Sequence, residues 1–227
     1  MKSWSLSDFL MAIFALSDEL SFPPVHLAEK DGLLAIGGDL DPQRLLLAYT
    51  SGIFPWYEAP PVLWWCPNPR FVLFPGELRK SKTVRSLLNK NAFQFTIDQD
   101  FEQVIRHCRN IKRSNQDGTW ITEDVVRAYQ QLHRQGYAHS AEVWKDGILV
   151  GGLYGIRLGQ VFFGESMFSL VSNASRYAFT CYTEQLKTEG VQLIDCQVYS
   201  EYLESMGARM IDGKEFDALL KEYIPAR

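Results

Sequence analysis

The order of apolar and polar positions predicts three consecutive helices in the middle of the chain. Apolar side chains recur there every three or four residues, which places them on one face of a helix. Each segment also begins with a side chain that can cap a helix end. The predicted helices cover residues 81–88, 98–108 and 122–135.

The pattern then changes to short apolar stretches separated by turn sequences. The first turn is Asp146-Gly147 and the second contains Gly159, and both are typical of tight connections between antiparallel strands. We therefore expect an antiparallel meander. Its strands cover residues 141–145, 148–156 and 161–164.

A further helix and a further strand follow the meander. Residues 173–189 are expected to form a helix that stops at Gly190, and residues 191–198 an apolar strand. A helical crossover would return this strand to the sheet beside the meander. The order of elements predicts an α+β domain with a mixed, mostly antiparallel sheet, a layout that resembles the N-acetyltransferase-like (GNAT-like) fold.

The first third of the chain has a different amino-acid composition. Residues 22–74 are rich in proline, glycine and aromatic side chains. They contain one clear helix, which is capped by Asp41, starts at Pro42 and stops at Gly52. We therefore predict a small N-terminal domain at residues 1–74 and a larger domain at residues 75–227.

An apolar run at residues 9–16 lies between acidic residues, with Asp8 before it and Asp18 and Glu19 after it. Because the run is short and closely flanked by acids, it predicts a short amphipathic helix capped near Ser7 and not a secretion signal. No stretch approaches the roughly 20 apolar residues that span a bilayer. We expect a cytoplasmic protein with no membrane contact.

Composition limits the partners. The chain is 46% hydrophobic, which argues against disorder, and its net charge of -4 means that a nucleic acid would need a local basic patch. The four cysteines have no CxxC spacing, which favours reduced cytosolic thiols over a zinc site. The densest basic clusters are Arg79, Lys80, Lys82 and Arg85, and then Arg109, Lys112 and Arg113. Such clusters are ordinarily solvated surface, and phosphate binding is the functional alternative.

Three polar residues stand out against apolar strands. Alternation along residues 191–198 puts Asp195 and Gln197 on one face, roughly 7 Å apart. A polar pair that faces water at a strand end is the simpler interpretation. Glu165 follows a strand whose apolar residues end at Phe163, where a solvated turn residue is usual. The residues alone leave these alternatives open.

Several short segments occur together in one order along the chain. They are LLAIGGDL (33–40), GIFPWY (52–57), LWWCPNPR (63–70), GTWIT (118–122), FGESMFS (163–169) and LIDCQV (193–198). In this order and spacing they resemble the leucyl/phenylalanyl-tRNA–protein transferase family, from about residue 22 onward. The resemblance implies transfer of Leu, Phe and Met from aminoacyl-tRNA to acceptor proteins that begin with Arg or Lys, which marks those proteins for degradation as N-degrons.

Such a transfer begins with an activated ester, so we expect no ATP, metal, cofactor or covalent intermediate. The attacking α-amine has a reference pKa of about 7.7 to 8.0, which leaves a substantial neutral fraction near pH 7. The resemblance implies that Gln197 accepts a hydrogen bond from this amine and that Asp195 fixes the amide of Gln197. It also implies that Glu165 pairs with the cationic side chain of the acceptor.

The resemblance assigns the donor side to apolar and basic residues. Trp56 and Trp120 are similar to residues that hold the 3′-terminal adenosine by stacking, with core packing as the alternative. Trp64 and Trp65 are expected to pack at the domain junction. The aminoacyl pocket maps onto Leu153, Phe162, Met167, Phe179 and Tyr182, which would otherwise be ordinary core. The cluster expected at the acceptor stem of the tRNA is Arg79, Lys80, Lys82 and Arg85.

Two other functions stay open. A GNAT acyltransferase that uses acyl-CoA would need a glycine-rich loop for the pyrophosphate, whereas Glu165 stands at the expected strand-to-helix junction and puts an acid where a phosphate would lie, which argues against this cofactor. A non-catalytic tRNA-binding module would explain the tryptophans and the basic residues, but not Asp195 and Gln197. The expected partners are Leu-tRNA, Phe-tRNA, Met-tRNA and the acceptor protein, with the chain acting as a monomer.

Overall fold

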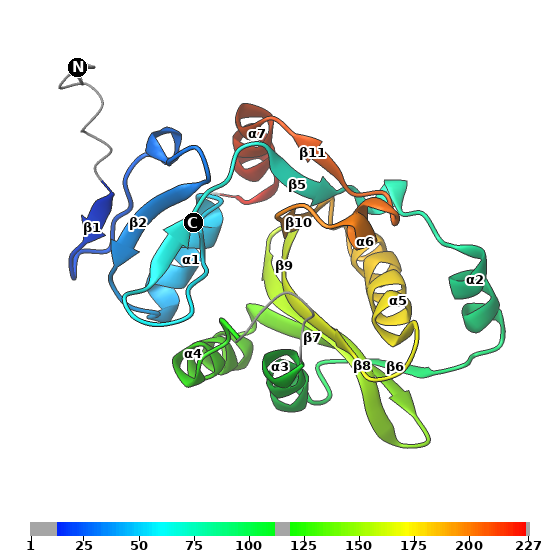
Figure 1. Cartoon of the computed structure of the whole chain (residues 1–227). Helices are drawn as coiled ribbons and strands as arrows, with labels where there is room; N and C mark the ends of the chain where they lie inside the picture. Colours follow the sequence, from blue (N-terminus) through cyan, green and yellow to red (C-terminus); the bar gives the residue numbers. More distant parts are fainter. Residues whose placement is uncertain (1–12, 112–118, 226–227) are drawn as a thin grey trace, which may run out of the picture.

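The strands form two separate sheets, as Figure 1 shows for the computed structural model, which describes residues 13–111 and 119–225. The smaller sheet has the order β1-β2-β4-β3, and a short 3-10 turn, Val25–Leu27, precedes β2. Its strands are β1 (Phe14–Leu16), β2 (Leu33–Gly37), β3 (Phe54–Pro55) and β4 (Leu63–Trp65).

Helix α1 (Pro42–Thr50) accompanies the smaller sheet and has the predicted ends. The Asp41 side chain accepts a hydrogen bond from the backbone N–H of Gln43 at 2.8 Å, as an N-cap does. Gly52 follows the helix with φ of 71°, and a Cβ there would lie 2.7 Å from the ring of Phe216. This close approach brings helix α7 (Gly213–Tyr223) against the N-terminal part.

The larger sheet has seven strands in the order β11-β5-β10-β9-β8-β7-β6. All its neighbouring pairs are antiparallel except β10 and β9, which are parallel. The predicted α+β class, the mixed sheet and the meander are confirmed. The strands are β5 (Arg70–Leu73), β6 (Gln94–Ile97), β7 (Ala138–Lys145), β8 (Ile148–Leu158), β9 (Val161–Ser169), β10 (Leu193–Gln197) and β11 (Arg209–Ile211).

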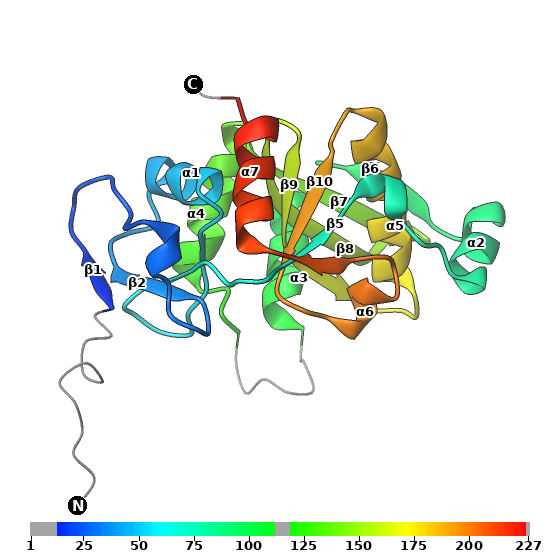
Figure 2. The same ribbon diagram turned by 90° about the horizontal axis from the view of Figure 1, so that it is seen from above.

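Helices cover both faces of the larger sheet (Figures 1 and 2). Alternation along β8 shows the two layers. Tyr154 contacts Phe101 and Tyr129 of two helices on one face, whereas Leu153 belongs to the core cluster that contains Phe179 on the other face. The helices are α2 (Lys82–Asn89), α3 (Phe101–Asn110), α4 (Glu123–Arg134), α5 (Ala174–Thr188) and α6 (Glu201–Glu204). Within the described ranges, no helix is long and apolar enough to cross a membrane.

The four long helices predicted after residue 75 are all present. The second begins later than expected because Asp100, and not Asp98, caps it through the N–H of Gln103. The capping residues of α2 and α4, Ser81 and Thr122, also agree with the sequence pattern. Periodicity and caps were sufficient here because each helix buries one apolar face, α3, α4 and α5 against the larger sheet and α2 against α5.

Three expectations differ from the structure. The apolar run at residues 9–16 ends in strand β1, which pairs with β2, whereas residues 9–12 of the predicted helix lie outside the described residues. Strand β5 precedes the expected domain boundary at residue 75, yet it pairs within the larger sheet. Strand β9 continues to Ser169 and does not end at residue 164, so Glu165 lies inside a strand.

Candidate active site

A cavity of about 600 Å³ lies between the N-terminal part and the larger sheet. Phe54 and Trp56 line it from the N-terminal side, and β8, β9 and β10 line it from the other. Strands β9 and β10 run parallel and adjacent, so polar residues toward their carboxyl ends meet. Glu165 of β9 and Gln197 of β10 are two such residues, and both line the cavity.

The end of β10 departs from regular alternation. Its pairing with β5 shifts register between Asp195 and Gln197, and Gln197 has a left-handed backbone with φ of 64°. The regular strand from which a shared face was predicted is therefore interrupted. As a result, the two side chains have different partners: Asp195 is fully buried against Arg70, and Gln197 turns to Glu165.

Glu165, and not Asp195, holds the amide of Gln197. The Nε2 of Gln197 donates to Oε1 of Glu165 at 2.9 Å, whereas Asp195 Oδ1 accepts only from the backbone N–H of Gln197, also at 2.9 Å. The predicted role of Asp195 toward the side chain is thus corrected. Among the described residues no donor bonds to Oε1 of Gln197, so this oxygen remains an acceptor beside the cavity.

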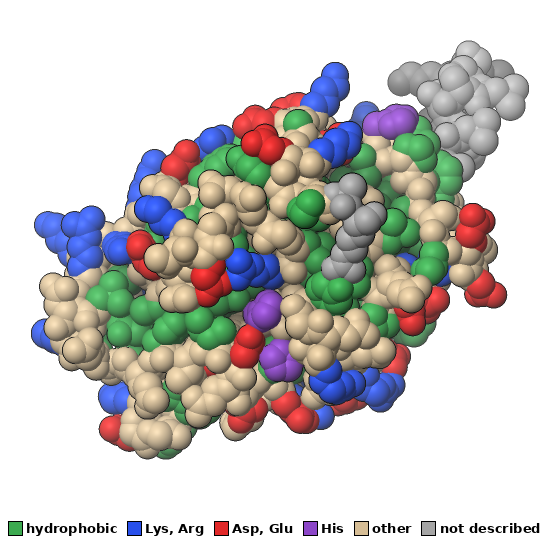
Figure 3. Space-filling model, turned by 180° about the vertical axis from the view of Figure 1, so that it is seen from behind, with side chains coloured by type: hydrophobic (Ala, Val, Ile, Leu, Met, Phe, Trp, Pro, Cys, Tyr) green, Lys and Arg blue, Asp and Glu red, His purple; other side chains and the backbone are tan. Residues whose placement is uncertain are grey.

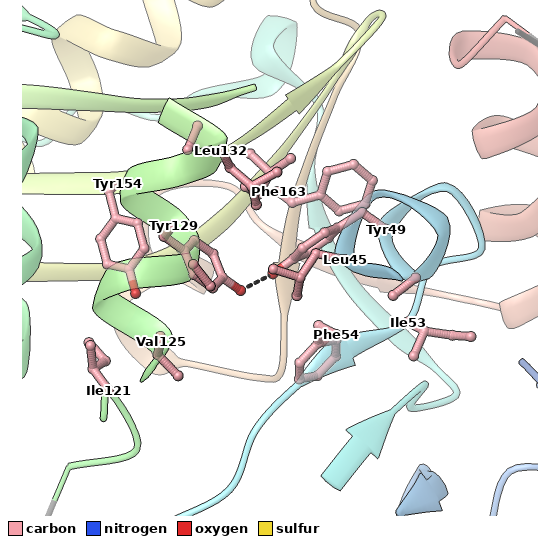
Figure 4. Packing of buried hydrophobic residues seen from close by; sticks show 14 of the residues in the cluster. Leu45, Tyr49, Ile53, Phe54, Ile121, Val125, Tyr129, Leu132, Tyr154 and Phe163 are labelled. Carbon is pink, nitrogen blue, oxygen red and sulfur yellow. Dashed lines mark hydrogen bonds between the residues drawn. The ribbon is translucent and has the colours of Figure 1, made fainter. Parts of the chain in front are cut away.

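Two buried tyrosines also donate to Glu165. Tyr49 of α1 donates to Oε1 at 2.7 Å and Tyr129 of α4 donates to Oε2 at 3.0 Å. The two hydroxyl oxygens also contact each other, as the dashed line in Figure 4 marks, so the two hydroxyl protons are shared among three contacts. Burial raises the pKa of Glu165 to about 7, although the hydrogen bonds from both tyrosines act in the opposite direction. Burial also raises the pKa of Tyr49 and Tyr129 well above the usual value, which keeps them neutral donors.

Arg70 and Asp195 fix the backbone under this site. Nε and Nη2 of Arg70 donate to the two carboxylate oxygens of Asp195 at 2.8 and 2.6 Å. Burial lowers the pKa of Arg70, but the adjacent carboxylate outweighs it and raises the pKa overall. Nη1 of Arg70 has no hydrogen-bond partner in the described part of the chain, and the guanidinium instead faces the rings of Phe54 and Phe216 at 4.8 and 4.7 Å.

The tryptophans differ in their exposure. Trp56 is 37% exposed and Trp120 only 8%, and both line the cavity. Trp65 packs against Trp56 with ring centroids 5.7 Å apart and donates from Nε1 to its carbonyl oxygen. Trp64 is fully buried in the smaller sheet, where Nε1 donates to Gly37. The ring of Trp56 is therefore accessible to a ligand without disturbing the core, whereas the ring of Trp120 also belongs to the hydrophobic core.

Cys196 is a candidate nucleophile by position, since it lies between Asp195 and Gln197 and lines the cavity. Burial raises the pKa of its thiol, so the thiol stays protonated. A protonated thiol is a poor nucleophile. Within the described ranges, no group of three or more His, Cys, Asp or Glu side chains could hold a metal ion.

Comparison with known proteins agrees with this arrangement. Residues 72–221 match the leucyl/phenylalanyl-tRNA protein transferase family, and residues 38–68 match the N-terminal domain of the same family. The chain belongs to the leucyl/phenylalanyl-tRNA–protein transferase family. The relative from Syntrophobacter fumaroxidans is 55% identical over 216 residues, which cover 95% of this chain and 92% of that one. The relative from Flavobacterium johnsoniae is 56% identical over 210 residues, which cover 92% and 99%.

Likenesses to solved structures are more distant. L-PGS from Bacillus licheniformis has a TM-score of 0.39 and 13% identity, over 76% of this chain and 57% of that one. A GCN5-related N-acetyltransferase from Kribbella flavida has a TM-score of 0.35 and 12% identity, over 73% and 59%. The family assignment rests on the relatives in sequence.

In this leucyl/phenylalanyl-tRNA–protein transferase family member, most of the predicted aminoacyl pocket lines the cavity. Leu153, Phe162, Met167 and Phe179 line it from β8, β9 and α5. Tyr182 does not line the cavity. It packs edge-on against Phe162 with ring centroids 5.1 Å apart, so it supports the wall from behind.

The predicted basic cluster lies apart from the cavity, around the start of α2. Figure 3 shows Lys and Arg side chains gathered at the end of the molecule where α2 lies. Arg79, Lys80 and Arg85 line a hollow of about 680 Å³, and Lys187 of α5 also lines it. Lys80 is paired with Glu184 at 2.8 Å. Lys82 does not line the hollow, and Lys112 and Arg113 of the second cluster lie outside the described residues.

Glu165 does not lie at the strand-to-helix junction, so the expectation that its charge excludes acyl-CoA is wrong. Because β9 continues to Ser169, the junction with α5 is residues 170–173, and Glu165 lies well before it. Glu165 therefore says nothing about a pyrophosphate site in this family member. Its contacts with Gln197 and the two tyrosines give it a place in the cavity instead.

Sequence reasoning did not identify Arg70, Tyr49 and Tyr129 as site residues. Arg70 carries a weak signal, because it is a lone cation at the start of the apolar run Phe71 to Phe74. The tyrosines resemble ordinary core positions on amphipathic helices. Their partner Glu165 is 116 and 36 positions away along the chain, a distance that local patterns do not span.

Proposed function

We propose that this protein transfers Leu, Phe or Met from aminoacyl-tRNA to the N-terminal Arg or Lys of acceptor proteins, and so marks them for N-degron degradation. The observation that supports this most is one cavity that brings together an apolar pocket, two tryptophans and the Gln197–Glu165 pair. The relatives from Syntrophobacter fumaroxidans and Flavobacterium johnsoniae are leucyl/phenylalanyl-tRNA–protein transferases by name. A cytoplasmic location and action as a monomer belong to the same proposal.

On the donor side, the cavity suits the end of an aminoacyl-tRNA. Trp56 and Trp120 stack on the terminal adenosine in this proposal, which is supported by their position in the cavity wall and by the ability of aromatic faces to bind unpaired bases with little regard to sequence. The apolar wall of Leu153, Phe162 and Met167 accepts a bulky side chain, and the flexible thioether of Met167 adapts to branched and aromatic shapes.

On the acceptor side, Gln197 orients the attacking amine. Its Nε2 is held by Glu165, so its Oε1 is free to accept a hydrogen bond from the α-amino group of the acceptor. The neutral amine attacks the ester carbonyl, a C–N bond forms, and the bond from that carbonyl to the ribose oxygen breaks. The proton lost from nitrogen balances the proton gained by the ribose hydroxyl. The amide therefore acts by position and not as a strong base.

Asp195 acts indirectly in this proposal. It is buried against Arg70 and accepts from the backbone N–H of Gln197, so it holds the left-handed turn from which the amide projects. Glu165 supplies the negative charge for the cationic first residue of the acceptor, since a carboxylate at a cavity wall attracts and pairs with such a cation.

The basic cluster is proposed to bind the acceptor stem of the tRNA. Arg79, Lys80, Lys82 and Arg85 lie at or near the start of α2, and phosphate binding is mainly electrostatic. Because Lys80 already pairs with Glu184, its contribution to phosphate binding is expected to be smaller than that of Arg85.

A transfer assay tests the function. Labelled Phe-tRNA or Leu-tRNA is mixed with the protein and a peptide that begins with Arg, and label in the peptide is measured. The same peptide with a blocked N-terminus is the control, and it should receive no label. Binding of tRNA without transfer would instead support a non-catalytic tRNA-binding module, and transfer only from acyl-CoA would support an acyl-CoA-dependent enzyme.

A further inference from the structure

Three side chains from different parts of the chain meet in one closed set of contacts. Tyr49 contacts Oε1 of Glu165 at 2.7 Å, Tyr129 contacts Oε2 at 3.0 Å, and the two hydroxyls contact each other. Both tyrosine side chains are fully buried, and they point toward one another from α1 and α4 (Figure 4). The two hydroxyls are therefore shielded from solvent, whereas Glu165 also lines the cavity.

The set of contacts among Tyr49, Tyr129 and Glu165 has two protonation states, which differ in the number of protons available for hydrogen bonds. When Glu165 is ionised, two hydroxyl protons serve three oxygen–oxygen contacts, and both are best used on the carboxylate, because hydrogen bonds to a charge are the stronger ones. When Glu165 carries a proton, three protons serve three contacts, so that each hydroxyl and the protonated carboxyl oxygen donate once and the other carboxyl oxygen only accepts. The set can therefore hold one extra proton without losing a contact.

Other groups around Glu165 affect the balance between these states. Gln197 of β10 donates a further hydrogen bond to Oε1, which favours the ionised state. The negative charge of Asp195 favours neutral Glu165, whereas the positive charge of Arg70 of β5 favours ionised Glu165. Tyr154 of β8 lies beside Tyr129 with ring centroids 5.6 Å apart. With the pKa of Glu165 raised to about 7, chiefly by burial, both states are populated near neutral pH.

We propose that Tyr49 and Tyr129 are positioning residues for acceptor recognition, because they hold the Glu165 carboxylate ionised and aimed at the cavity. This rests on the proposed function, in which a charged Glu165 attracts the acceptor's cation. Without a hydroxyl, the ionised form loses a hydrogen bond to a charge, whereas the neutral form loses two contacts between uncharged groups, and the hydrogen bonds from the two tyrosines are what lower the pKa of Glu165. Removal of either hydroxyl therefore favours neutral Glu165, and recognition requires a higher pH.

The experiment compares Tyr49→Phe and Tyr129→Phe with wild type in the full chain. We measure kcat/KM for an Arg-starting peptide between about pH 5 and pH 9, which brackets the ordinary carboxyl and α-amino pKa values. The α-amino group of the peptide titrates alike in every reaction, so a shift between profiles belongs to the enzyme. We expect each variant to move the midpoint up by about one pH unit, which lowers kcat/KM about fivefold at pH 7 and restores it at high pH.

Two controls separate positioning from folding. Tyr177→Phe removes a hydroxyl from another buried tyrosine, which donates to the carbonyl of Phe93 away from the cavity, and it should leave the profile unchanged. In a Glu165→Gln background, Tyr49→Phe should have little further effect on use of the Arg-starting peptide. Aminoacyl-tRNA affinity should stay unchanged in all of these variants.

The outcomes are distinguishable. If the profiles of Tyr49→Phe and Tyr129→Phe coincide with that of wild type, or if activity falls equally at every pH, the tyrosines are structural and the inference is wrong. If wild type transfers no aminoacyl group at all, the proposed function itself fails. A variant that does not fold is replaced by the other, since the two hydroxyls come from separate helices.

Discussion

Arg70 of β5 and Asp195 of β10 form a two-point ion pair, and both side chains are buried almost completely. The pair joins positions 125 residues apart, and Asp195 also accepts from the backbone N–H of Gln197. The geometry of the cavity thus depends on a charge pair that itself has no access to solvent. Removal of one partner leaves the other charge buried and unpaired.

Asp195→Asn is therefore expected to destabilise the protein by about 3 to 5 kcal/mol, the range for a broken buried ion pair. The variant keeps the shape of the side chain and removes its charge. The measurement is urea unfolding. Asp124→Asn is the matched control, because Asp124 pairs with Arg127 where both side chains are about two-thirds exposed. It should change stability by less than about 1 kcal/mol, and equal effects of the two variants would contradict the prediction.

Replacement of Gln197 should reduce transfer while tRNA binding is retained. Gln197→Asn keeps an amide and suits the left-handed backbone at this position, but it draws the amide back by one methylene. Misplacement by about an ångström is expected to lower kcat on the order of a hundredfold. Gln197→Ala should lose at least as much. Single-turnover rates with saturating aminoacyl-tRNA measure the effect, and an unchanged rate in both variants would remove Gln197 from the site.

Glu165→Gln should act on the acceptor and not on the donor. It keeps the shape of the side chain and removes the charge that pairs with the acceptor's Arg or Lys. For an Arg-starting peptide, kcat/KM is expected to fall by the equivalent of about 1.5 to 3 kcal/mol in transition-state free energy, whereas the affinity for aminoacyl-tRNA should stay nearly intact. A peptide that begins with a neutral residue is the control. A loss of equal size with that peptide would show that Glu165 acts only through the amide of Gln197.

Substitutions of Trp56 and Trp120 should differ in their effects on aminoacyl-tRNA binding and on protein stability. Trp56→Ala is expected to weaken aminoacyl-tRNA binding by about 1 to 3 kcal/mol through lost stacking, with little change in Tm, because Trp56 is 37% exposed. Trp120→Ala should reduce both quantities, since this side chain is 8% exposed and belongs to the core. KM and Tm are measured for each variant. A fall in Tm with unchanged KM in both would reject stacking.

Replacement of Lys80, Lys82 and Arg85 by Ala should weaken tRNA binding and flatten its salt dependence, because each lost phosphate contact removes a share of counterion release. Small aminoacyl-adenosine analogues should bind as before. Glu184→Gln is the variant with the opposite expectation: it frees Lys80 from its ion pair and should strengthen tRNA binding. Equal damage to tRNA and to the analogues would count against the cluster.

Much of the fold could be predicted because its helices are amphipathic and capped. In α4, Val125, Val126, Tyr129 and Leu132 all face the core, as their spacing indicates. The antiparallel meander could be predicted equally well, because Asp146 and Gly147 form the turn between β7 and β8 and both have positive φ. These features are local, and local chemistry determines them.

The candidate site was predicted less completely for reasons that are also physical. Alternation along β10 assumes an unbroken strand, and the shift between Asp195 and Gln197 breaks it. Alternation therefore predicts the wrong partner for Asp195, and it gives no indication of Arg70, because the two positions lie 125 residues apart. Tyr49 has the spacing of a core residue, and only the assembled structure shows where its hydroxyl points.

The place of β10 in the larger sheet has a consequence for the order in which a new chain acquires activity. This strand inserts between β9 and β5, so until it is synthesised both neighbours lack a pairing partner on that side. Synthesis proceeds from the N-terminus, and β10 starts only at Leu193 of 227 residues. The ribosome must therefore synthesise β10 before Gln197 can reach Glu165, and until then the nascent chain remains inactive with open strand edges that favour association.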